Sequence, residues 1–341
     1  MGMQRERVNG PLHCAPGYLT ERIKNEILHL KDTPECEVIE YEDLIDSSLM
    51  SPSRWITMAN DIKKNYDDYD GFVVIHGTDT MAYTASALSF MLGNLSKPVI
   101  LTGSNIPMCE TINDASRNLT VAIMYAAALE IPEVCIFFNN TLLRGNRTTK
   151  LDNYGLNAFE SPNYPPLATL KVHTKFNQDN ILPLPRRRLR VRTAMEENIV
   201  CIRLIPGFSD SALHSLIRDE SVRGLVLEVY GNGTGLYKPE LLDALKDAAE
   251  NDVVVVAATQ CLKGTVDLDA YSAGAAAAAR VVSASDMTTE AAVTKLSFLL
   301  GNVPTKRVKT LMKEPICGEL TPLREYKTDG LLNTTREFSY P

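Results

Sequence analysis

The sequence lacks the features that mark a secreted or membrane-bound protein. No run of about 18 apolar residues could cross a bilayer, and no N-terminal apolar stretch resembles a signal peptide. The seven cysteines are odd in number, widely spaced and without a CxxC pair, which argues against a disulfide framework and against a zinc site. We therefore expect reduced, mostly packed thiols, a cytoplasmic location, no membrane partner and no metal.

An excess of positive charge is also lacking. The formal net charge is -7, from 35 lysines and arginines against 42 aspartates and glutamates. A general nucleic-acid binder needs clustered basic side chains to neutralise phosphates, so this balance argues against that class. What the chain does have is 341 residues, 45% hydrophobic and 23% charged, which is enough for two globular domains of ordinary size.

Short apolar runs alternate with helical patterns, and this alternation is typical of an α/β fold in which helices cover a parallel sheet. The expected strands are 71–75, 98–103, 133–138, 198–207, 224–235 and 252–260. Helices are expected to begin near Ser51 and Met81 and to cover 209–219, 238–251 and 287–302; the alanine-rich stretch 273–282 is also helix-prone.

A change of composition near residues 179–198 predicts the connection between the two domains. The stretch "DNILPLPRRRLRVRTAMEEN" has two prolines, five arginines and no apolar periodicity. We expect an N-terminal domain over 1–180, a linker over 181–197, a C-terminal domain over 198–312 and a polar, loosely ordered tail over 313–341. The arginine run is interpreted as a solvated linker, with a nuclear-localisation signal as the alternative.

The stretch "HGTDT", residues 76–80, places polar side chains between a strand and a helix. Ligands of open parallel sheets bind beyond the carboxyl ends of the strands, and Gly77 permits a close backbone approach. The following helix offers free N–H groups and a positive dipole end to a carboxylate, while Asp79 offers its charge to an ammonium group. Together they suit an amino acid. The alternative is that Thr78 or Asp79 only caps the helix.

A second turn, "LLRGNRTTK", follows the strand 133–138 and ends in Lys150. A single loop lysine is usually a solvated surface residue, and that is the alternative here. A lysine near Thr78 and Asp79 would instead be a candidate base, because burial makes a lysine lose its proton more easily. Threonine is a poor nucleophile unless another group takes its proton. The pattern alone leaves open whether these three residues meet.

Five blocks carry a resemblance to a known family: "HGTDTMAYTASALSFML", "KPVILTGS", "FFNNTLLRGNRTTK", "AFESPNYPPL" and "SDMTTEAAVTKL". Together they resemble the cytosolic-type (type I) L-asparaginases, and most of all the asparaginase domain of the animal enzyme also called 60-kilodalton lysophospholipase. The resemblance covers roughly residues 2–320. It implies two α/β domains of three αβα layers, and hydrolysis of L-asparagine to L-aspartate and ammonia without a cofactor.

The resemblance also implies roles for the residues of the two turns. Asp79 would bind the α-ammonium group of the substrate, and Lys150 together with Asp79 would polarise Thr78. Asn232, in "YGNGTG", matches a position that reaches the site of a neighbouring subunit. The family forms dimers or dimers of dimers, so a homodimer or homotetramer is expected.

A third segment, "DSS", matches the substrate-binding turn of the family. Its residues Asp46, Ser47 and Ser48 would hold the α-carboxylate through serine and backbone groups. The next residue is usually acidic in this motif, whereas Leu49 stands here. The sequence departs from the family pattern at that position.

The resemblance further implies a primary nucleophile, a threonine in a "TGGTIGM" motif at the end of the first strand. This sequence contains no TGGT, and Gly2 and Met3 align with the last two residues of that motif. "LTGSNIP" at 101–107 is a later motif of the family and not a displaced copy. We therefore expect the first strand of the N-terminal domain to be absent, the covalent route to lack its main nucleophile, and the chain to be shortened. The ankyrin repeats that often follow in animal relatives are not found in this sequence either.

Three other functions remain open at this point. A non-catalytic amino-acid-binding or scaffold protein would keep Asp79 and the helix N-terminus. Lysophospholipase activity is a minor alternative, because the sequence has no G-x-S-x-G nucleophile elbow. Dinucleotide binding through "GNGTG" is weaker still, because the spacing differs from G-x-G-x-x-G.

Overall fold

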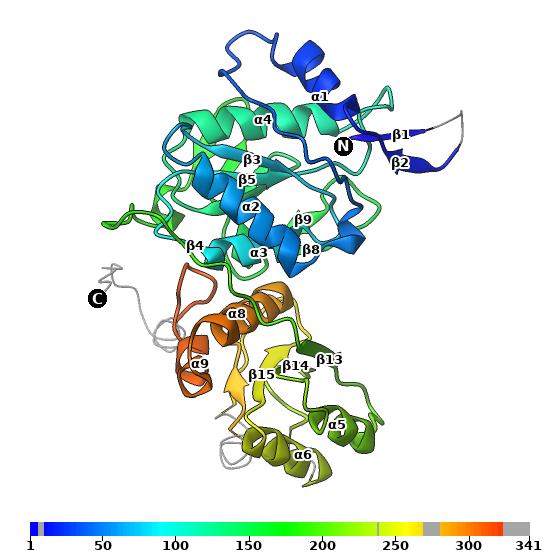
Figure 1. The fold of residues 1–341 in the computed structure, drawn as a ribbon, viewed down its shortest axis with the longest axis vertical. Helices are drawn as coiled ribbons and strands as arrows, with labels where there is room; N and C mark the ends of the chain where they lie inside the picture. The colour runs from blue at the N-terminus through cyan, green and yellow to red at the C-terminus, as the bar shows by residue number, and fades with distance from the viewer. Residues whose placement is uncertain (6–9, 237–238, 269–279, 323–341) are drawn as a thin grey trace.

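The structure is a computed structural model that describes residues 1–5, 10–236, 239–268 and 280–322. The N-terminal half forms one lobe and the C-terminal half the other (Figure 1). Helix α8 (Thr289–Asn302) lies where the two lobes meet and packs against α3 (Met81–Met91). The junction between the lobes is therefore a helix-on-helix contact.

The N-terminal sheet has the strand order β11–β10–β7–β6–β5–β3. The parallel arrangement expected from the sequence is confirmed for β3, β5 and β6, whereas β7, β10 and β11 run antiparallel to their neighbours. The bounds are β3 Phe72–Ile75, β5 Val99–Thr102, β6 Val134–Phe138, β7 Thr141–Arg144, β10 Ala168–Leu170 and β11 Thr174–Phe176.

The reversal at β7 has a local cause. Asn139 and Asn140 join β6 to β7 and have positive φ angles of 41° and 72°. A two-residue turn with both φ angles positive matches the right-handed twist of paired strands, and asparagine tolerates that conformation. Part of the stretch expected to be a turn is therefore the second strand of a β-hairpin.

Helices cover both faces of the N-terminal sheet: α4 (Ala115–Ala128) lies on one face, and α2 (Pro52–Lys64) and α3 lie on the other (Figure 1). Ser51 is extended and Pro52 is in the first turn of α2, as the sequence predicts for a helix start. The buried side of α2 includes Met58, Ala59 and Ile62. The three layers expected from the resemblance are thus present in this lobe.

The N-terminal residues lie outside the six-stranded sheet. Among the described strands, β1 (Met3–Arg5) pairs with β2 (Leu12–Cys14) alone, in an antiparallel ribbon. The ribbon is followed by α1 (Tyr18–Arg22) and a π-helical turn, η1 (Ile23–Ile27). Among the described residues, β5 is the single strand that pairs with β3. The strand that precedes the "HGTDT" turn is therefore an edge strand.

The C-terminal sheet is parallel throughout its described strands, in the order β13–β14–β15–β16. Its strands are β13 Ile199–Arg203, β14 Gly224–Val229, β15 Val254–Thr259 and β16 Val282–Ser283. Its helices, besides α8, are α5 Asp210–Ile217, α6 Pro239–Glu250 and α9 Thr305–Met312. Residues 273–279 of the alanine-rich stretch expected to be helical lie outside the described residues. Its last residue, Val282, belongs to β16 and not to a helix.

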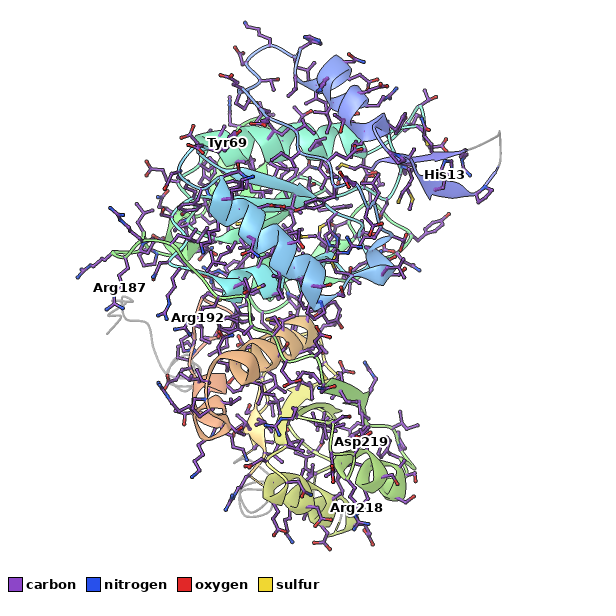
Figure 2. All side chains as sticks on the ribbon, viewed as in Figure 1. His13, Tyr69, Arg187, Arg192, Arg218 and Asp219 are labelled. Atoms are coloured by element: carbon purple, nitrogen blue, oxygen red, sulfur yellow. The ribbon has the colours of Figure 1, made fainter. Side chains whose placement is uncertain are left out.

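The segment that connects the lobes is partly strand. β12 (Arg190–Val191) pairs antiparallel with β4 (Leu92–Gly93), and Leu189 and Val191 pack against the main core. Figure 2 shows Arg187 projecting outward from this connection. The arginine run is thus solvated on one side and packed through its apolar residues on the other.

The first part of the expected tail is ordered, contrary to the sequence prediction. The Lys295 ammonium and the Glu319 carboxylate lie 2.6 Å apart, and both side chains are fully buried. Glu319 also accepts hydrogen bonds from the backbone N–H groups of Ile316 and Cys317. Glycine and proline in this stretch indicated a loose coil, but the buried ion pair anchors it to α8.

One hydrophobic core extends across both lobes. It joins α2, α3 and the N-terminal sheet to the C-terminal strands and α8, and Phe90 stacks on Phe298 with 6.1 Å between ring centroids. All seven cysteines are free thiols. Three of them are exposed and Cys135 alone is buried, so the expectation of mostly packed thiols is wrong. Within the described part of the chain, no helix has the length and apolar character needed to cross a membrane.

Candidate active site

The "HGTDT" turn lies between the end of β3 and the start of α3. Gly77 in this turn is pressed against the segment that contains Ser47. A Cβ atom at position 77 would lie 2.5 Å from the Ser47 Oγ atom, which is closer than van der Waals contact allows. A side chain at this position would therefore separate the two segments.

His76, which sequence reasoning missed, fixes the turn from inside the protein. Its ring is buried; Nδ1 lies 2.6 Å from the Gly77 carbonyl oxygen and Nε2 lies 2.9 Å from the Thr84 hydroxyl. The Trp55 indole N–H donates to the same hydroxyl at 2.9 Å. This chain of donors and acceptors is complete for a neutral imidazole protonated at Nδ1. Burial lowers the pKa of His76, opposed by the hydrogen bond to Gly77.

Within the described residues, neither Thr78 nor Asp79 makes a helix-capping hydrogen bond. The residue at the N-cap of α3 is Thr80, whose hydroxyl donates instead to the Ser47 carbonyl oxygen at 2.7 Å. The Asp79 side chain is 66% exposed. No hydrogen bond therefore supports the capping alternative, and the exposed carboxylate is accessible to a ligand.

Lys150 reaches this turn from the segment that follows β7. After β7 the chain forms a 3-10 turn, η3 (Gly145–Arg147), and then β8 (Thr149–Lys150), which pairs with β9 (Phe159–Glu160). The Lys150 Nζ atom lies 2.8 Å from the Thr78 Oγ1 atom and 2.6 Å from the Asp79 Oδ1 atom. The structure thus brings together the three residues whose meeting the sequence left open.

The arrangement allows a proton transfer. The lysine side chain is 17% exposed, so it is largely shielded from water. As an ammonium group it donates to both oxygens; as a neutral amine it accepts the hydroxyl proton of Thr78 while Asp79 stabilises the resulting positive charge. A threonine activated in this way can attack a carbonyl carbon.

The "DSS" segment is also part of this site. Ser47, Ser48 and Leu49 form a 3-10 turn, η2, and the Asp46 carboxylate accepts the Ser48 N–H at 2.9 Å. Hydrogen bonds from the Ser48 side chain and backbone lower the pKa of Asp46. Because Ser47 is buried against Gly77, the segment lies directly beside Thr78 and Asp79.

Asn232 is placed apart from this group. It follows β14 in the C-terminal lobe, and its carbonyl oxygen accepts the Asp267 N–H at 2.8 Å. Within the described residues, no contact joins it to Thr78, Asp79 or Lys150. Its expected role at the site of a neighbouring subunit stays a prediction.

A buried carboxylate lies behind the lysine strand. Glu290, at the start of α8, accepts a hydrogen bond from the Thr149 hydroxyl at 2.7 Å. Desolvation raises the pKa of Glu290, opposed by this hydrogen bond from Thr149. No group of three or more histidine, cysteine, aspartate or glutamate side chains suited to a metal ion occurs in the part of the chain that the structure describes.

The fold and the site define a two-lobed α/β protein with a threonine–lysine–aspartate group at the carboxyl edge of its N-terminal sheet. Comparison with protein families is consistent with this. The family described as "Asparaginase, N-terminal" matches residues 3–182, and that described as "Glutaminase/Asparaginase C-terminal domain" matches residues 198–312. The chain belongs to the asparaginase family, which confirms the resemblance seen in the sequence blocks.

Individual relatives agree with this assignment. L-asparaginase 1 of Escherichia coli K12 is 44% identical over 329 residues, which cover 94% of this chain and 95% of the relative. The human 60 kDa lysophospholipase is also 44% identical, over 84% of this chain, which spans about half of that relative's length. The crystal structure of L-asparaginase I from Vibrio cholerae matches with a TM-score of 0.87 and 40% identity, over 94% of this chain and 95% of that chain. These matches confirm the two-domain asparaginase-like fold.

Proposed function

We propose that the site is that of an L-asparagine amidohydrolase, an enzyme that converts L-asparagine and water to L-aspartate and ammonia. The observation that supports the proposal most is the position of the Lys150 Nζ atom, within 2.8 Å of Thr78 and 2.6 Å of Asp79. The sequence similarity to proteins named L-asparaginase points to the same substrate.

Each charged group of the substrate has a partner in the proposed complex. The Asp79 carboxylate receives the α-ammonium group. The Ser47–Ser48 turn and the free N–H groups at the start of α3 receive the α-carboxylate. The side-chain amide is then directed to the Thr78 hydroxyl, from which Lys150 takes the proton and later returns one to the departing ammonia.

The number of threonines in the reaction is a finer part of the proposal. The resemblance assigns the primary attack to a threonine of a TGGT motif, and the printed sequence contains no such motif. We propose that Thr78, Asp79 and Lys150 form the second half of a two-threonine apparatus. Thr78 alone would then support little or no covalent turnover.

Ammonia release from L-asparagine tests both parts. The assay compares the chain of this sequence, the printed chain, with an extended chain to which the TGGT motif and its strand have been added. We expect clear turnover by the extended chain and little by the printed chain. Strong turnover by the printed chain would contradict the two-threonine account, and no turnover by either chain would contradict the amidohydrolase proposal.

The second candidate function is non-catalytic amino-acid binding. The exposed Asp79 carboxylate at the start of α3 favours it, because both features bind a zwitterion without any nucleophile. Calorimetric titration of both chains with L-asparagine and L-aspartate separates the two candidates. Binding without turnover by the extended chain would favour the binding protein.

We also propose a homodimer or homotetramer in the cytoplasm. The family assignment supports the assembly, and Asn232 is the residue expected to face a neighbouring site. Light scattering on the purified protein should give two or four times the chain mass of 37.7 kDa. A mass of one chain at micromolar concentration would contradict the assembly.

A further inference from the structure

The strand that presents Lys150 is held by residues of the other lobe. Arg147, three residues before the lysine, has its NH1 atom 2.8 Å from the Asp286 Oδ2 atom. The two side chains are 2% and 0% exposed. Asp286 lies between β16 and α8, so this fully buried ion pair joins the N-terminal and C-terminal lobes directly behind the site.

Two further contacts hold the Arg147 guanidinium in place. Its Nε group donates to the Gly318 carbonyl oxygen at 2.9 Å, and its NH2 group donates to the Thr321 hydroxyl at 2.7 Å. The Thr321 N–H in turn donates to the Asp286 carboxylate at 2.8 Å. The closed set of contacts leaves the arginine little freedom to shift relative to the C-terminal lobe.

A second contact from the same corner reaches Thr149. The Glu290 carboxylate, in the first turn of α8, accepts a hydrogen bond from the Thr149 hydroxyl at 2.7 Å. Successive side chains of a strand point to opposite faces. Since Thr149 faces Glu290 in the C-terminal lobe, Lys150 must face the opposite way, where Thr78 and Asp79 lie.

We propose that the corner from Asp286 to Glu290 is a positioning element for the active-site lysine. Acting through Arg147 and Thr149, it fixes the register and the facing of β8, so that the lysine amine lies within hydrogen-bond distance of Thr78. The C-terminal lobe would thus take part in the reaction without touching the substrate. The effect of this corner on catalysis rests on the proposed amidohydrolase function, whereas its effect on the position of the Lys150 amine does not.

The test uses Asp286→Asn and Thr149→Val, each of which removes one contact of the corner. Glu133→Gln is the matched control. Glu133 pairs with Arg144, three residues before Arg147, at 2.5 Å, and that pair is equally buried at 2% and 4% exposure. Arg144 also donates to the Gly318 carbonyl oxygen at 3.3 Å, but within the described residues no contact joins Glu133 to the corner from Asp286 to Glu290. All three variants should lose thermal stability, so a loss of stability does not by itself distinguish them.

The first readout is the rate at which a small acylating reagent modifies Lys150, measured by peptide mass spectrometry against the exposed Lys171. The second, in the chain carrying the TGGT strand, is kcat and KM for L-asparagine. We expect both Asp286→Asn and Thr149→Val to speed the modification of Lys150 several-fold. In the kinetic assay, each should lower kcat by roughly tenfold or more and leave KM nearly unchanged, because small displacements of a reacting group are costly. Glu133→Gln should leave both readouts near those of the parent.

Unchanged modification and kcat in Thr149→Val would overturn the proposal, and so would equal effects of Glu133→Gln. If Asp286→Asn does not fold, Thr149→Val decides, since it keeps the buried ion pair. The modification rate remains informative in a chain without turnover. A failure of the proposed function is therefore distinguishable from a failure of the positioning role.

Discussion

The two sides of the site are held in different ways. The side with Thr78 and Asp79 is fixed within the N-terminal lobe, by neutral hydrogen bonds that connect His76, Thr84 and Trp55. The side with Lys150 is fixed by buried charges of the C-terminal lobe. Contacts within the N-terminal lobe thus position one half of the site, whereas the position of the other half depends on how the two lobes meet.

Substitutions on the two sides of the site should therefore have different effects. Damage to the turn should remain local and act through packing. Substitutions on the Lys150 side that break a buried ion pair should cost more stability, because they leave an unpaired charge in the interior. The following predictions test the contrast, beginning with the largest effect.

Lys150→Met should lower kcat for L-asparagine by about 10²–10⁴-fold in the chain that carries the TGGT strand, because it removes the base. Stability should change little, because the side chain reaches a partly exposed partner. Ammonia release with saturating substrate measures the effect. Lys171→Met, at an exposed position, is the control, and a residual rate near that of the parent would refute a role for the lysine.

Lys295→Met should lower the free energy of unfolding by about 3–5 kcal/mol, because Glu319 is left buried and uncompensated. Burial raises the pKa of Glu319 and the Lys295 ammonium lowers it, with a net value below the ordinary one. Urea denaturation followed by circular dichroism measures the change. The control Lys246→Met, in an exposed pair with Asp243, should cost no more than about 1 kcal/mol. Similar losses in both variants would contradict the assigned importance of burial.

Gly77→Ala should destabilise the protein by about 1–3 kcal/mol, because the added Cβ atom collides with Ser47. The matched double variant with Ser47→Gly removes both atoms that the new methyl group would meet. It should therefore recover part of the loss, in a double-mutant cycle read by urea denaturation. Strict additivity of the two substitutions would mean that the close approach is not the cause.

His76 should make stability fall in mild acid. Its pKa is lowered by burial in the folded state, so the unfolded chain, with an ordinary pKa near 6.5, takes up the proton first as the pH falls. Stability is full above about pH 6.5 and decreases below it by at most about 1.4 kcal/mol per pH unit.

The variant His76→Gln should flatten the pH dependence of the unfolding free energy below about pH 6.5. His173→Gln, at an exposed position, should leave that dependence unchanged. Equal pH profiles for His76→Gln and the parent would show that the buried imidazole does not contribute.

The sequence predicts much of the fold because its signals are local. Apolar runs mark β3, β5 and β6, and Ser51 with Pro52 marks the start of α2. The hairpin at Asn139 and Asn140 carries a recognisable turn signal, but the expectation of a parallel sheet outweighed it. Order in residues 313–322 was not predictable, because it depends on a buried lysine 24 positions earlier than its glutamate partner.

The site shows the same division. Turns that follow strands make Thr78, Asp79 and Lys150 candidates, the family resemblance implies their roles, and their distances need the structure. His76 had a visible signal, a polar residue directly after an apolar strand, but nothing in the sequence shows its partners. Arg147 and Asp286 lie 139 positions apart, and only the packing of two lobes brings them together.

The most direct test is whether Asp79 and its surroundings bind a small zwitterion. Calorimetric titration with L-aspartate compares the parent chain with Asp79→Asn and with the control Asp219→Asn, whose residue lies in the other lobe (Figure 2). We predict that the parent and the control bind alike and that Asp79→Asn binds about ten- to a hundredfold more weakly, the usual loss for a hydrogen bond to a charged group. Equal binding by all three proteins, or none by the parent, would contradict the account.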